Sequence, residues 1–200
     1  MKKTRSSYNT KGRYYAILNA AEKLFGEKGY QNVSIGEIAR SAGVAKGLVN
    51  YHFSSKENLL IHVLSKGTAT LFDQLDYVTE RQETTRDKIQ AAIGIYLSIA
   101  SAGPGLTRMA MIAVFEAAYS ESIRKLWLQF MEKNLSKFNE LIEEGISRGE
   151  LKPVDSWLIT QLVMAMAFEV LRESTLRKEP LDPREAAEKV TTVLFEGISR

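Results

Sequence analysis

Apolar side chains recur every three to four positions along most of the chain, which is the spacing of one face of an α-helix. Only four prolines occur among the 200 residues, so few positions interrupt this pattern. The pattern therefore predicts an all-α protein. The predicted helices cover residues 14–28, 45–53, 56–76, 86–101, 107–118, 122–148, 155–178 and 183–198, with a further short helix between residues 34 and 43.

Local signals mark where the helices of the first third begin and end. Gly29 is a predicted C-cap, because glycine readily adopts the left-handed conformation that ends many helices. Ser34 and Glu37 form a predicted capping box, in which each side chain accepts a hydrogen bond from the backbone N–H of the other residue. Gly43 ends the short helix with a tight turn. A short helix, a glycine turn and a second helix together indicate a helix-turn-helix motif.

The second helix of that motif combines a glycine with several polar side chains. Ala45, Val49 and Phe53 are spaced four positions apart, so we expect them to face inward. A glycine on the opposite face lets the backbone lie close to a large partner, and polar groups beside it can bond base edges in the major groove of DNA. The residues left on the outward face or its flanks are Lys46, Gly47, Leu48, Asn50, Tyr51 and His52.

The following helix opens with a lysine in its first turn. Ser54 and Glu57 have the spacing of a second capping box, and Lys56 lies between them. A cation is unfavourable there, because the N-terminus of a helix carries a partial positive charge. A DNA phosphate would accept hydrogen bonds from Lys56 and from the free backbone N–H groups. We therefore expect Lys56 to bind phosphate.

Charge is distributed unevenly along the chain, which strengthens the prediction of DNA binding. Residues 1–66 contain eleven Lys or Arg and four Asp or Glu, a net charge of +7. The rest of the chain contains sixteen basic and twenty acidic residues, a net charge of −4. A basic front on a mildly acidic body is typical of a protein that meets a polyanion, although a basic N-terminal arm also serves solubility.

The stretch AAEKLFGEKGYQNVSIGEIARSAGVAKGLVNYHFSSKENLL, residues 20–60, resembles the DNA-binding domain of the TetR family of bacterial transcriptional regulators. The shared features, in order, are an aromatic and Gly pair, IA-x-x-AGV, K-G, HF and S-K-E-x-L-L. The resemblance implies an all-helical homodimer with three DNA-binding helices and a larger C-terminal effector domain. It also implies that the operator is contacted by the third helix and by the lysine that opens the fourth, here Lys46, Gly47, Leu48, Asn50, Tyr51, His52 and Lys56.

The third helix departs from the family pattern in ways that affect these contacts. Ala45 stands where the family often has Ser or Thr, so this helix lacks a side-chain N-cap. The common Tyr of the family falls at Asn50, and the aromatic residue is instead Tyr51. We therefore expect Asn50 to bond adenine, and Leu48, in place of a frequent Thr, to pack on a thymine methyl group.

Three side chains near this helix allow a second interpretation. His52 lies on a flank and is either a DNA contact or a packed histidine at the edge of the core. Tyr51 could be an ordinary surface aromatic residue. His62 lies within the apolar run 59–64, where a structural role is the expectation.

The remaining two-thirds of the chain contain apolar helices that could hold an effector. Residues 109–114, MAMIAV, are apolar on every side, which predicts a buried helix. Ligand pockets are mostly apolar with a few polar groups, and methionine adapts to varied shapes, although each such residue alone is more often core. The predicted ligand-binding residues are Tyr96, Arg108, Met111, Phe115, Trp127, Phe130, Met131, Met164 and Phe168, with Arg108, Glu116 or Asn134 as candidate polar anchors.

The last two helices are predicted to pair across a homodimer, as in the resembled family. Small residues on them allow close approach, and two copies about 34 Å apart would bind two half-sites of a palindrome one helical turn apart. The predicted face of the first of these helices comprises Trp157, Gln161, Met164, Ala165 and Phe168, and that of the second Ala186, Val190, Val193, Leu194 and Gly197.

Composition argues against several other functions. The chain has no cysteine and only two histidines, and it has no Gly-rich phosphate loop or cluster of metal ligands. We therefore predict no catalytic residues, no metal and no cofactor. The N-terminal stretch lacks the apolar segment of a signal peptide, and the most apolar run, residues 158–168, is too short to span a bilayer. These features predict a cytoplasmic protein without a membrane partner.

The sequence thus predicts a cytoplasmic, dimeric DNA-binding regulator, most simply a repressor that a small hydrophobic or aromatic ligand releases from a palindromic operator. Its predicted parts are a basic N-terminal arm at 1–13, a helix-turn-helix domain at 14–66 and an effector and dimerisation domain at 67–200. Three alternatives remain: a DNA-binding protein without a small effector, controlled by a protein partner or by its own concentration; an enzyme; and a membrane-surface protein that uses its basic arm.

Overall fold

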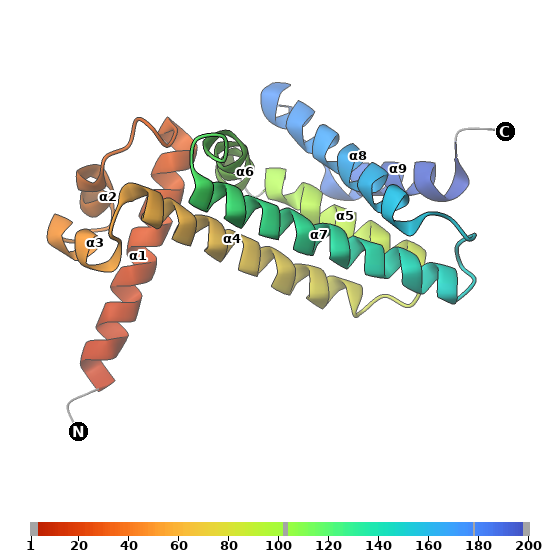
Figure 1. The fold of residues 1–200 in the computed structure, drawn as a ribbon, viewed down its shortest axis with the longest axis horizontal. Helices are drawn as coiled ribbons and strands as arrows, with labels where there is room; N and C mark the ends of the chain where they lie inside the picture. Colours follow the sequence, from red (N-terminus) through yellow and green to blue (C-terminus); the bar gives the residue numbers. More distant parts are fainter. Residues whose placement is uncertain (1–3, 102–103, 178, 198–200) are drawn as a thin grey trace. The chain divides into compact units, whose positions relative to one another are not determined.

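The computed structural model describes residues 4–101, 104–177 and 179–197. Within these ranges the chain forms helices and no strand, which confirms the predicted all-α class (Figure 1). Lys2 and Lys3 of the predicted basic arm lie outside the described residues. The helices are α1 Thr4–Lys28, α2 Ile35–Ser41, α3 Lys46–His52, α4 Lys56–Thr79, α5 Thr85–Ser101, α6 Pro104–Glu116, α7 Glu121–Ser147, α8 Ser156–Arg177 and α9 Pro183–Glu196.

Contacts divide the chain into two compact units. Unit 1 comprises Met1–Gly67 with Arg108–Leu126, and unit 2 comprises Thr68–Thr107 with Trp127–Arg200. The segment 108–126 therefore belongs with the helix-turn-helix helices, although it lies far from them in the sequence. Helices α4, α6 and α7 each begin in one unit and end in the other.

The core of unit 1 is built from the apolar faces of α1 to α4. Phe25, Phe53 and Leu59 are almost completely buried in one cluster, and Met109 of α6 and Ile123 of α7 are buried in the same cluster. Helix α1 begins ten residues before the predicted start at 14, because polar residues without an apolar face still continue a helix that is already formed.

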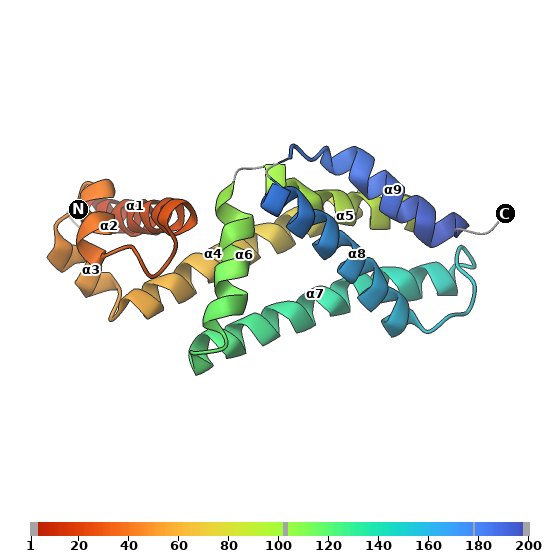
Figure 2. The ribbon, with the colours of Figure 1, turned by 90° about the horizontal axis from the view of Figure 1, so that it is seen from above.

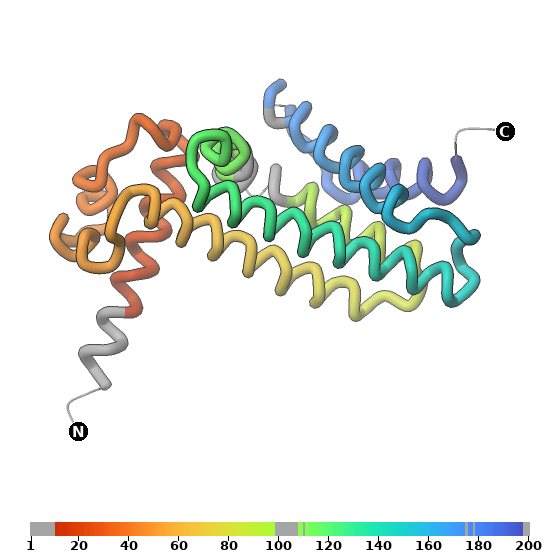
Figure 3. The backbone as a smooth tube through the Cα atoms, in the orientation of Figure 1, coloured from red at the N-terminus to blue at the C-terminus, as the bar shows by residue number. Residues whose placement is uncertain are grey.

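Most of the predicted helix ends of unit 1 are confirmed. Gly29 and Gly43 adopt φ angles of 82° and 66°, a left-handed conformation that disfavours any residue with a Cβ. The capping box of α2 is present, since the backbone N–H of Glu37 bonds the hydroxyl of Ser34 and the Glu37 carboxylate accepts the N–H of Ser34. The tight turn between α2 and α3 is traced in Figure 3.

The predicted cap of α4 is wrong by one residue. The helix begins at Lys56, and the hydroxyl of Ser55, not of Ser54, accepts the backbone N–H of Asn58 at 2.9 Å. Glu57 is therefore not part of a capping box. Its carboxylate accepts a hydrogen bond from the hydroxyl of Ser120 instead. Two consecutive serines made both registers possible, and the apolar face that begins at Leu59 selects the later one.

Unit 2 is a second helical core in which α5 packs against both α8 and α9. Figure 2 shows α9 lying alongside α5, and Gly94 of α5 allows close approach there, since a Cβ would lie 3.8 Å from Ala187. Helix α9 begins as predicted: the Asp182 carboxylate accepts the N–H groups of Arg184 and Glu185. In the described part of the chain, no helix is both long enough and apolar enough to cross a membrane.

Candidate nucleic-acid interface

The second and third helices meet at a turn that fixes their relative direction. Helix α2 ends in a turn in which the N–H of Val44 donates to the carbonyl of Ala39 at 3.0 Å. Gly43 supplies the positive φ that this reversal requires. Ala39 is 3% exposed, and its small side chain lets α3 pack closely on α2. The two helices and their turn form the helix-turn-helix motif that the sequence predicts.

The inner face of α3 is apolar and tightly packed. Val49 and Phe53 are 0% and 2% exposed, as their spacing predicts. The ring of Phe53 stacks on Tyr14 of α1, with ring centroids 5.3 Å apart. These contacts fix the rotation of α3 about its axis, and that rotation decides which side chains face outward.

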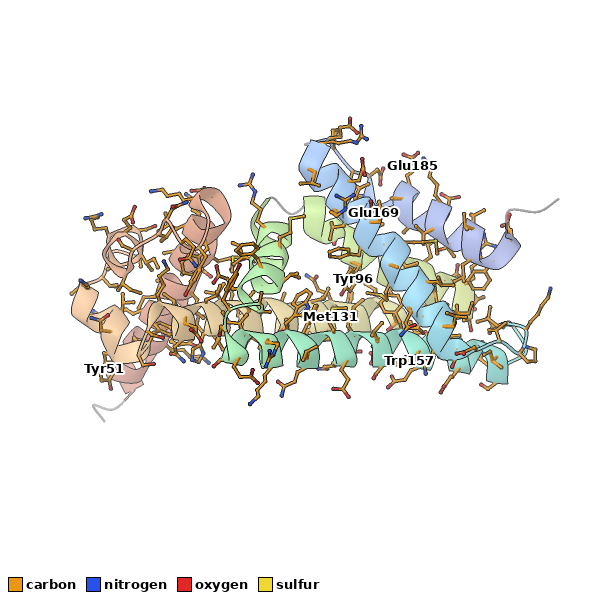
Figure 4. The ribbon with its side chains drawn as sticks, turned by 45° about the horizontal axis from the view of Figure 1, so that its top comes forward. Tyr51, Tyr96, Met131, Trp157, Glu169 and Glu185 are labelled. Atoms are coloured by element: carbon orange, nitrogen blue, oxygen red, sulfur yellow. The ribbon has the colours of Figure 1, made fainter. Side chains whose placement is uncertain are left out.

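The outer face of α3 carries the predicted DNA-binding side chains. Lys46, Gly47 and Asn50 are exposed, Tyr51 is 80% exposed, and Leu48 is half-buried on the flank. Figure 4 shows where Tyr51 lies on α3. A Cβ on Gly47 would have no atom within 4 Å, so nothing in the fold of the described residues requires a glycine there.

Ala45 is exposed, so the prediction that it faces inward is wrong. It is the N-cap of α3 and has extended backbone angles, so the four-residue helical spacing does not reach it. As expected, it provides no side-chain hydrogen bond to the first turn of α3.

His52 is half-buried among aromatic rings at the edge of the core. Its ring lies 5.7 Å from that of Tyr14, 5.3 Å from Tyr51 and 6.1 Å from Phe53, measured between centroids. Its Nε2 atom is buried and has no hydrogen-bond partner among the described residues. This environment favours the structural interpretation of His52 over direct DNA contact.

His62 has the structural role that its position in the sequence predicts. Its Nδ1 atom lies 3.1 Å from the hydroxyl oxygen of Tyr14, and its ring lies 5.4 Å from Phe53. Burial raises the pKa of the Tyr14 hydroxyl above its ordinary value. The two histidines therefore both pack against the aromatic residues Tyr14 of α1 and Phe53 at the end of α3.

Lys56 is held by the protein more closely than the sequence indicates. Its ammonium group donates to the carbonyl of Gln31 at 3.3 Å and lies 4.5 Å from the centroid of the Tyr30 ring. Burial lowers the pKa of Lys56, against the opposing effect of the nearby Glu116 and Glu37 carboxylates. The residue predicted to bind phosphate thus already ties the start of α4 to the turn between α1 and α2.

Among the described residues, three side-chain hydrogen bonds join the segment 108–126 to α1, to the turn between α1 and α2, and to α4, and sequence reasoning missed all three. The guanidinium of Arg108 donates to the carbonyl of Gly26 at 2.7 Å. The side-chain amide of Gln31 donates to the carboxylate of Glu116 at 2.9 Å, and the hydroxyl of Ser120 to that of Glu57 at 2.8 Å. The one sequence signal was an acidic residue, Glu116, at the end of an apolar helix.

The predicted ligand-binding residues are divided between the two units. Arg108, Met111 and Phe115 belong to unit 1, where Phe115 is 64% exposed. The others belong to unit 2, where Phe168 is 41% exposed. The guanidinium of Arg108 donates its hydrogen bond to the carbonyl of Gly26, within unit 1. The residues in unit 2 are Tyr96, Trp127, Phe130, Met131, Met164 and Phe168.

A polar pair lies inside the core of unit 2. Tyr96 of α5 is 7% exposed and its hydroxyl accepts a hydrogen bond from the side-chain amide of Asn134 of α7, which is fully buried. Burial raises the pKa of the Tyr96 hydroxyl. Figure 4 marks Tyr96, with Met131 of α7 and Trp157 of α8. Trp127 and Phe130 are in ring contact, with centroids 5.4 Å apart.

The residues of the predicted dimer faces are only partly exposed. Trp157, Gln161, Ala165 and Phe168 of α8 are exposed, whereas Met164 is buried in the core of unit 2. Of the predicted face of α9, Val193 and the cap Gly197 are exposed and Leu194 is half-buried, whereas Ala186 and Val190 are buried within unit 2. The four-residue spacing on α9 therefore identified an apolar face that is partly covered by other helices of unit 2. Further exposed apolar residues on α8 are Leu158, Leu162 and Leu176.

The geometry of α2 and α3 defines the class: a helix-turn-helix DNA-binding protein with an open, polar second helix. Residues 17–63 match the family model described as bacterial regulatory proteins, tetR family. This match places the helix-turn-helix region of the chain in that family of transcriptional regulators. The chain is accordingly a DNA-binding regulator of transcription.

Relatives extend the similarity over most of the chain. The chain is 23% identical over 188 residues to the fatty acid metabolism regulator protein of Bacillus subtilis, covering 93% of this chain and 95% of the relative. The structure of the regulator FadR from Bacillus subtilis with stearoyl-CoA has a TM-score of 0.82 and 22% identity, covering 93% and 100% of the two chains. AibR, solved with isovaleryl coenzyme A and operator DNA, has a TM-score of 0.73 and 20% identity, covering 92% and 98%. At these identities the solved structures support the fold.

Proposed function

We propose that this regulator acts in the cytoplasm as a homodimeric repressor, which binds a palindromic operator and leaves it when a hydrophobic ligand binds. The single observation that carries the proposal is α3, whose apolar face is buried while its polar face is open. Lys46, Gly47, Leu48, Asn50 and Tyr51 of this helix then meet the major groove. Lys56 binds a phosphate after leaving its present contacts, and His52 acts mainly through packing.

Dimerisation is supported by the exposed apolar residues of α8. Trp157, Leu158, Leu162 and Phe168 are between 41% and 51% exposed, and they follow one another along the same helix. An apolar surface of this kind is costly in water and is typical of an interface. A single helix-turn-helix binds DNA weakly, so a second copy gives the affinity that regulation needs.

A hydrophobic effector is supported by the core of unit 2 and by the relatives. Among the described residues, the buried polar side chains of this unit are neutral: Thr79, Thr85, Asn134, Thr160 and Thr191. Such surroundings suit an uncharged, apolar molecule or an apolar part of one, since an unpaired charge would be costly. The solved relatives with stearoyl-CoA and isovaleryl coenzyme A make an acyl thioester the first class to examine.

Release from DNA would follow from a shift in population between two forms of the dimer. An effector that binds better to the form with mis-spaced recognition helices favours that form. Helices α4, α6 and α7 each have residues in both units, so they are the elements that would carry such a change. A coupling of about 1–3 kcal/mol gives a 5–150-fold change in operator affinity.

The DNA-binding part is tested by selecting random duplex DNA with the purified protein at a stated salt concentration and sequencing the bound pool. The expected result is an enriched palindrome with half-sites about one helical turn apart. Uniform recovery of all sequences, with binding that fades evenly as salt rises, would contradict sequence-specific binding.

The effector part is tested by titrating long-chain and short-chain acyl-CoA against the protein on its fluorescent operator, with free CoA as the matched control. We expect release by an acyl thioester and none by CoA, because the apolar chain supplies the differential affinity. If neither long-chain nor short-chain acyl-CoA releases the DNA, the effector is not an acyl thioester. Control by a protein partner would then be the better account.

A further inference from the structure

Lys56 is half-buried and contacts two protein groups that compete with a phosphate. The backbone carbonyl of Gln31 accepts a hydrogen bond from the ammonium group at 3.3 Å, and the centroid of the Tyr30 ring lies 4.5 Å from the ammonium nitrogen. Both groups belong to the turn that joins α1 and α2. The ammonium group has three N–H donors, so a phosphate that reaches it in place shares it with Gln31 and Tyr30, and one that lies farther out can bind it only after the turn releases it.

Glu116 fixes that turn from a distant point of the sequence. Glu116 is the last residue of α6 and is 8% exposed. Its carboxylate accepts a hydrogen bond from the side-chain amide of Gln31 at 2.9 Å. The contact joins positions 85 residues apart, within unit 1. The negative charge of Glu116 also favours the protonated form of Lys56, while burial acts in the opposite direction on its pKa. Glu116 therefore acts on Lys56 in two ways, through the position of Gln31 and through charge.

We infer that Glu116 is a positioning residue for DNA binding, which draws Lys56 onto the protein in competition with the operator phosphate. The inference rests on the phosphate role proposed above for Lys56. Glu116 itself touches no DNA in this account. Because it ends α6, whose first residues belong to unit 2, a displacement of α6 would strengthen or weaken the hold on Lys56. The pair Glu116 and Lys56 would then set how much of the binding free energy the lysine contributes.

A double-mutant cycle tests the inference on the full-length protein and its selected operator. Glu116→Gln keeps the size and a hydrogen-bonding oxygen but removes the charge, and Lys56→Met removes the ammonium. We expect Glu116→Gln alone to tighten operator binding by about threefold to tenfold at low salt, the size of a partly screened charge interaction. In the Lys56→Met background the same change is expected to retain only the long-range effect of removing one negative charge, because no ammonium remains to be released.

Glu22→Gln is the matched control. It makes the same change of net charge in the same unit, at a carboxylate 3.0 Å from the ammonium of Lys66. Lys66 follows Lys56 by ten residues on α4, about 15 Å along the helix. The control is expected to change affinity equally in both Lys56 backgrounds, because its effect on DNA is only the long-range one.

A second variant keeps the inference testable if Glu116→Gln lowers the melting temperature. Gln31→Leu removes the amide that Glu116 holds, at an exposed position that tolerates substitution. It is expected to tighten binding only when Lys56 is present. Equal gains with and without Lys56, or no gain from either variant, would overturn the inference.

The outcomes also separate the inference from the proposed function. If wild-type protein selects an operator but Lys56→Met changes neither affinity nor the salt dependence, Lys56 binds no phosphate and the inference fails while operator binding stands. If wild-type protein selects no sequence, the proposed function itself fails. A loss of about one unit of salt slope in Lys56→Met, together with the expected coupling, supports both.

Discussion

The outer faces of α3 and α8 are both exposed, and they differ in chemistry. On α3 the exposed side chains are Lys46, Asn50 and Tyr51, on either side of a glycine. On α8 they include Trp157 and Leu162, along a helix of three times the length. One face offers hydrogen-bonding groups and a bare backbone, and the other offers an apolar surface.

The comparison shows that exposure alone does not identify a partner. Base edges and phosphates are recognised through hydrogen bonds and charge, which the face of α3 supplies. Another protein surface is recognised through apolar burial, which the face of α8 supplies. If both assignments hold, damage to α8 should abolish DNA binding through loss of the dimer, and damage to α3 should leave the dimer intact.

The largest effect is expected from Leu162→Lys on α8. A charge in the centre of an apolar interface costs several kcal/mol, so the dimer should dissociate and operator affinity should fall by at least about 100-fold. Sedimentation velocity and operator titration measure the two effects on the same sample. Val154→Lys, at an apolar residue of similar exposure outside any helix, is the control and should leave the dimer intact. A Leu162→Lys protein that stays dimeric would show that α8 is not the interface.

A smaller effect is expected from Asn50→Ala on α3. Loss of a side chain that bonds a base edge costs about 1–3 kcal/mol, and the cost should be confined to one position of the operator. Operator titration against single-base variants measures it. Sedimentation should give the wild-type dimer, and the melting temperature should be unchanged because Asn50 is exposed. Equal loss on every operator variant would mean that Asn50 reads no base.

Gly47→Ala adds a single carbon atom, and its effects on stability and on DNA binding are expected to have opposite signs. A Cβ there has no neighbour within 4 Å, so the fold should gain up to about 1 kcal/mol from the better helix former. Operator affinity should nevertheless fall by about tenfold if the backbone approaches DNA closely. Thermal unfolding and operator titration measure the two quantities.

Gly145→Ala in α7 is the opposite control for the Gly47 prediction. Its Cβ would lie 2.5 Å from Cγ2 of Thr85 and 2.8 Å from Cδ1 of Leu151. That crowding should cost about 1–3 kcal/mol of stability. If Gly47→Ala left operator affinity unchanged, the bare backbone of α3 would have no role in binding.

The smallest effect concerns the pH dependence of the cap that starts α2. Hydrogen bonds from Ser34 and from Lys28 lower the pKa of Glu37 from 4.5 to about 2. The carboxylate therefore contributes to stability above pH 4.5, and this contribution is lost as pH falls from 4.5 towards 2. Glu37→Gln should flatten the stability curve in that window, as measured by thermal unfolding. An unchanged curve would mean that the cap is already lost in wild-type protein.

Features encoded by short stretches of sequence were predictable. The capping box of Ser34 and Glu37, the turn at Gly43 and the cap at Asp182 each depend on residues within four positions, and all three are present. The outer face of α3 followed from two inward residues, Val49 and Phe53, because helical spacing then fixes the remaining positions.

Features that depend on distant contacts were not predictable. The tie between Gln31 and Glu116 spans 85 positions, and that between Lys56 and Gln31 spans 25. No periodicity connects such residues. From the sequence alone, Lys56 was therefore predicted to be a free phosphate ligand and Arg108 an effector anchor. Ala186 and Val190 of the predicted α9 face are buried within unit 2 for a similar reason, since spacing identifies an apolar face but not the helix that covers it.

The central claim is that the outer face of α3 lies against DNA, and crosslinking from two matched tyrosines tests it most directly. Tyr51 of α3 and Tyr119, which follows α6, are both in unit 1 and are 80% and 77% exposed. A photoreactive phenylalanine at either position should give a stable protein, because each side chain is mostly in solvent. On the selected operator we expect a protein–DNA adduct from position 51, suppressed by unlabelled operator, and none from position 119. Equal adducts from both positions, or an adduct from position 119 alone, would contradict the account.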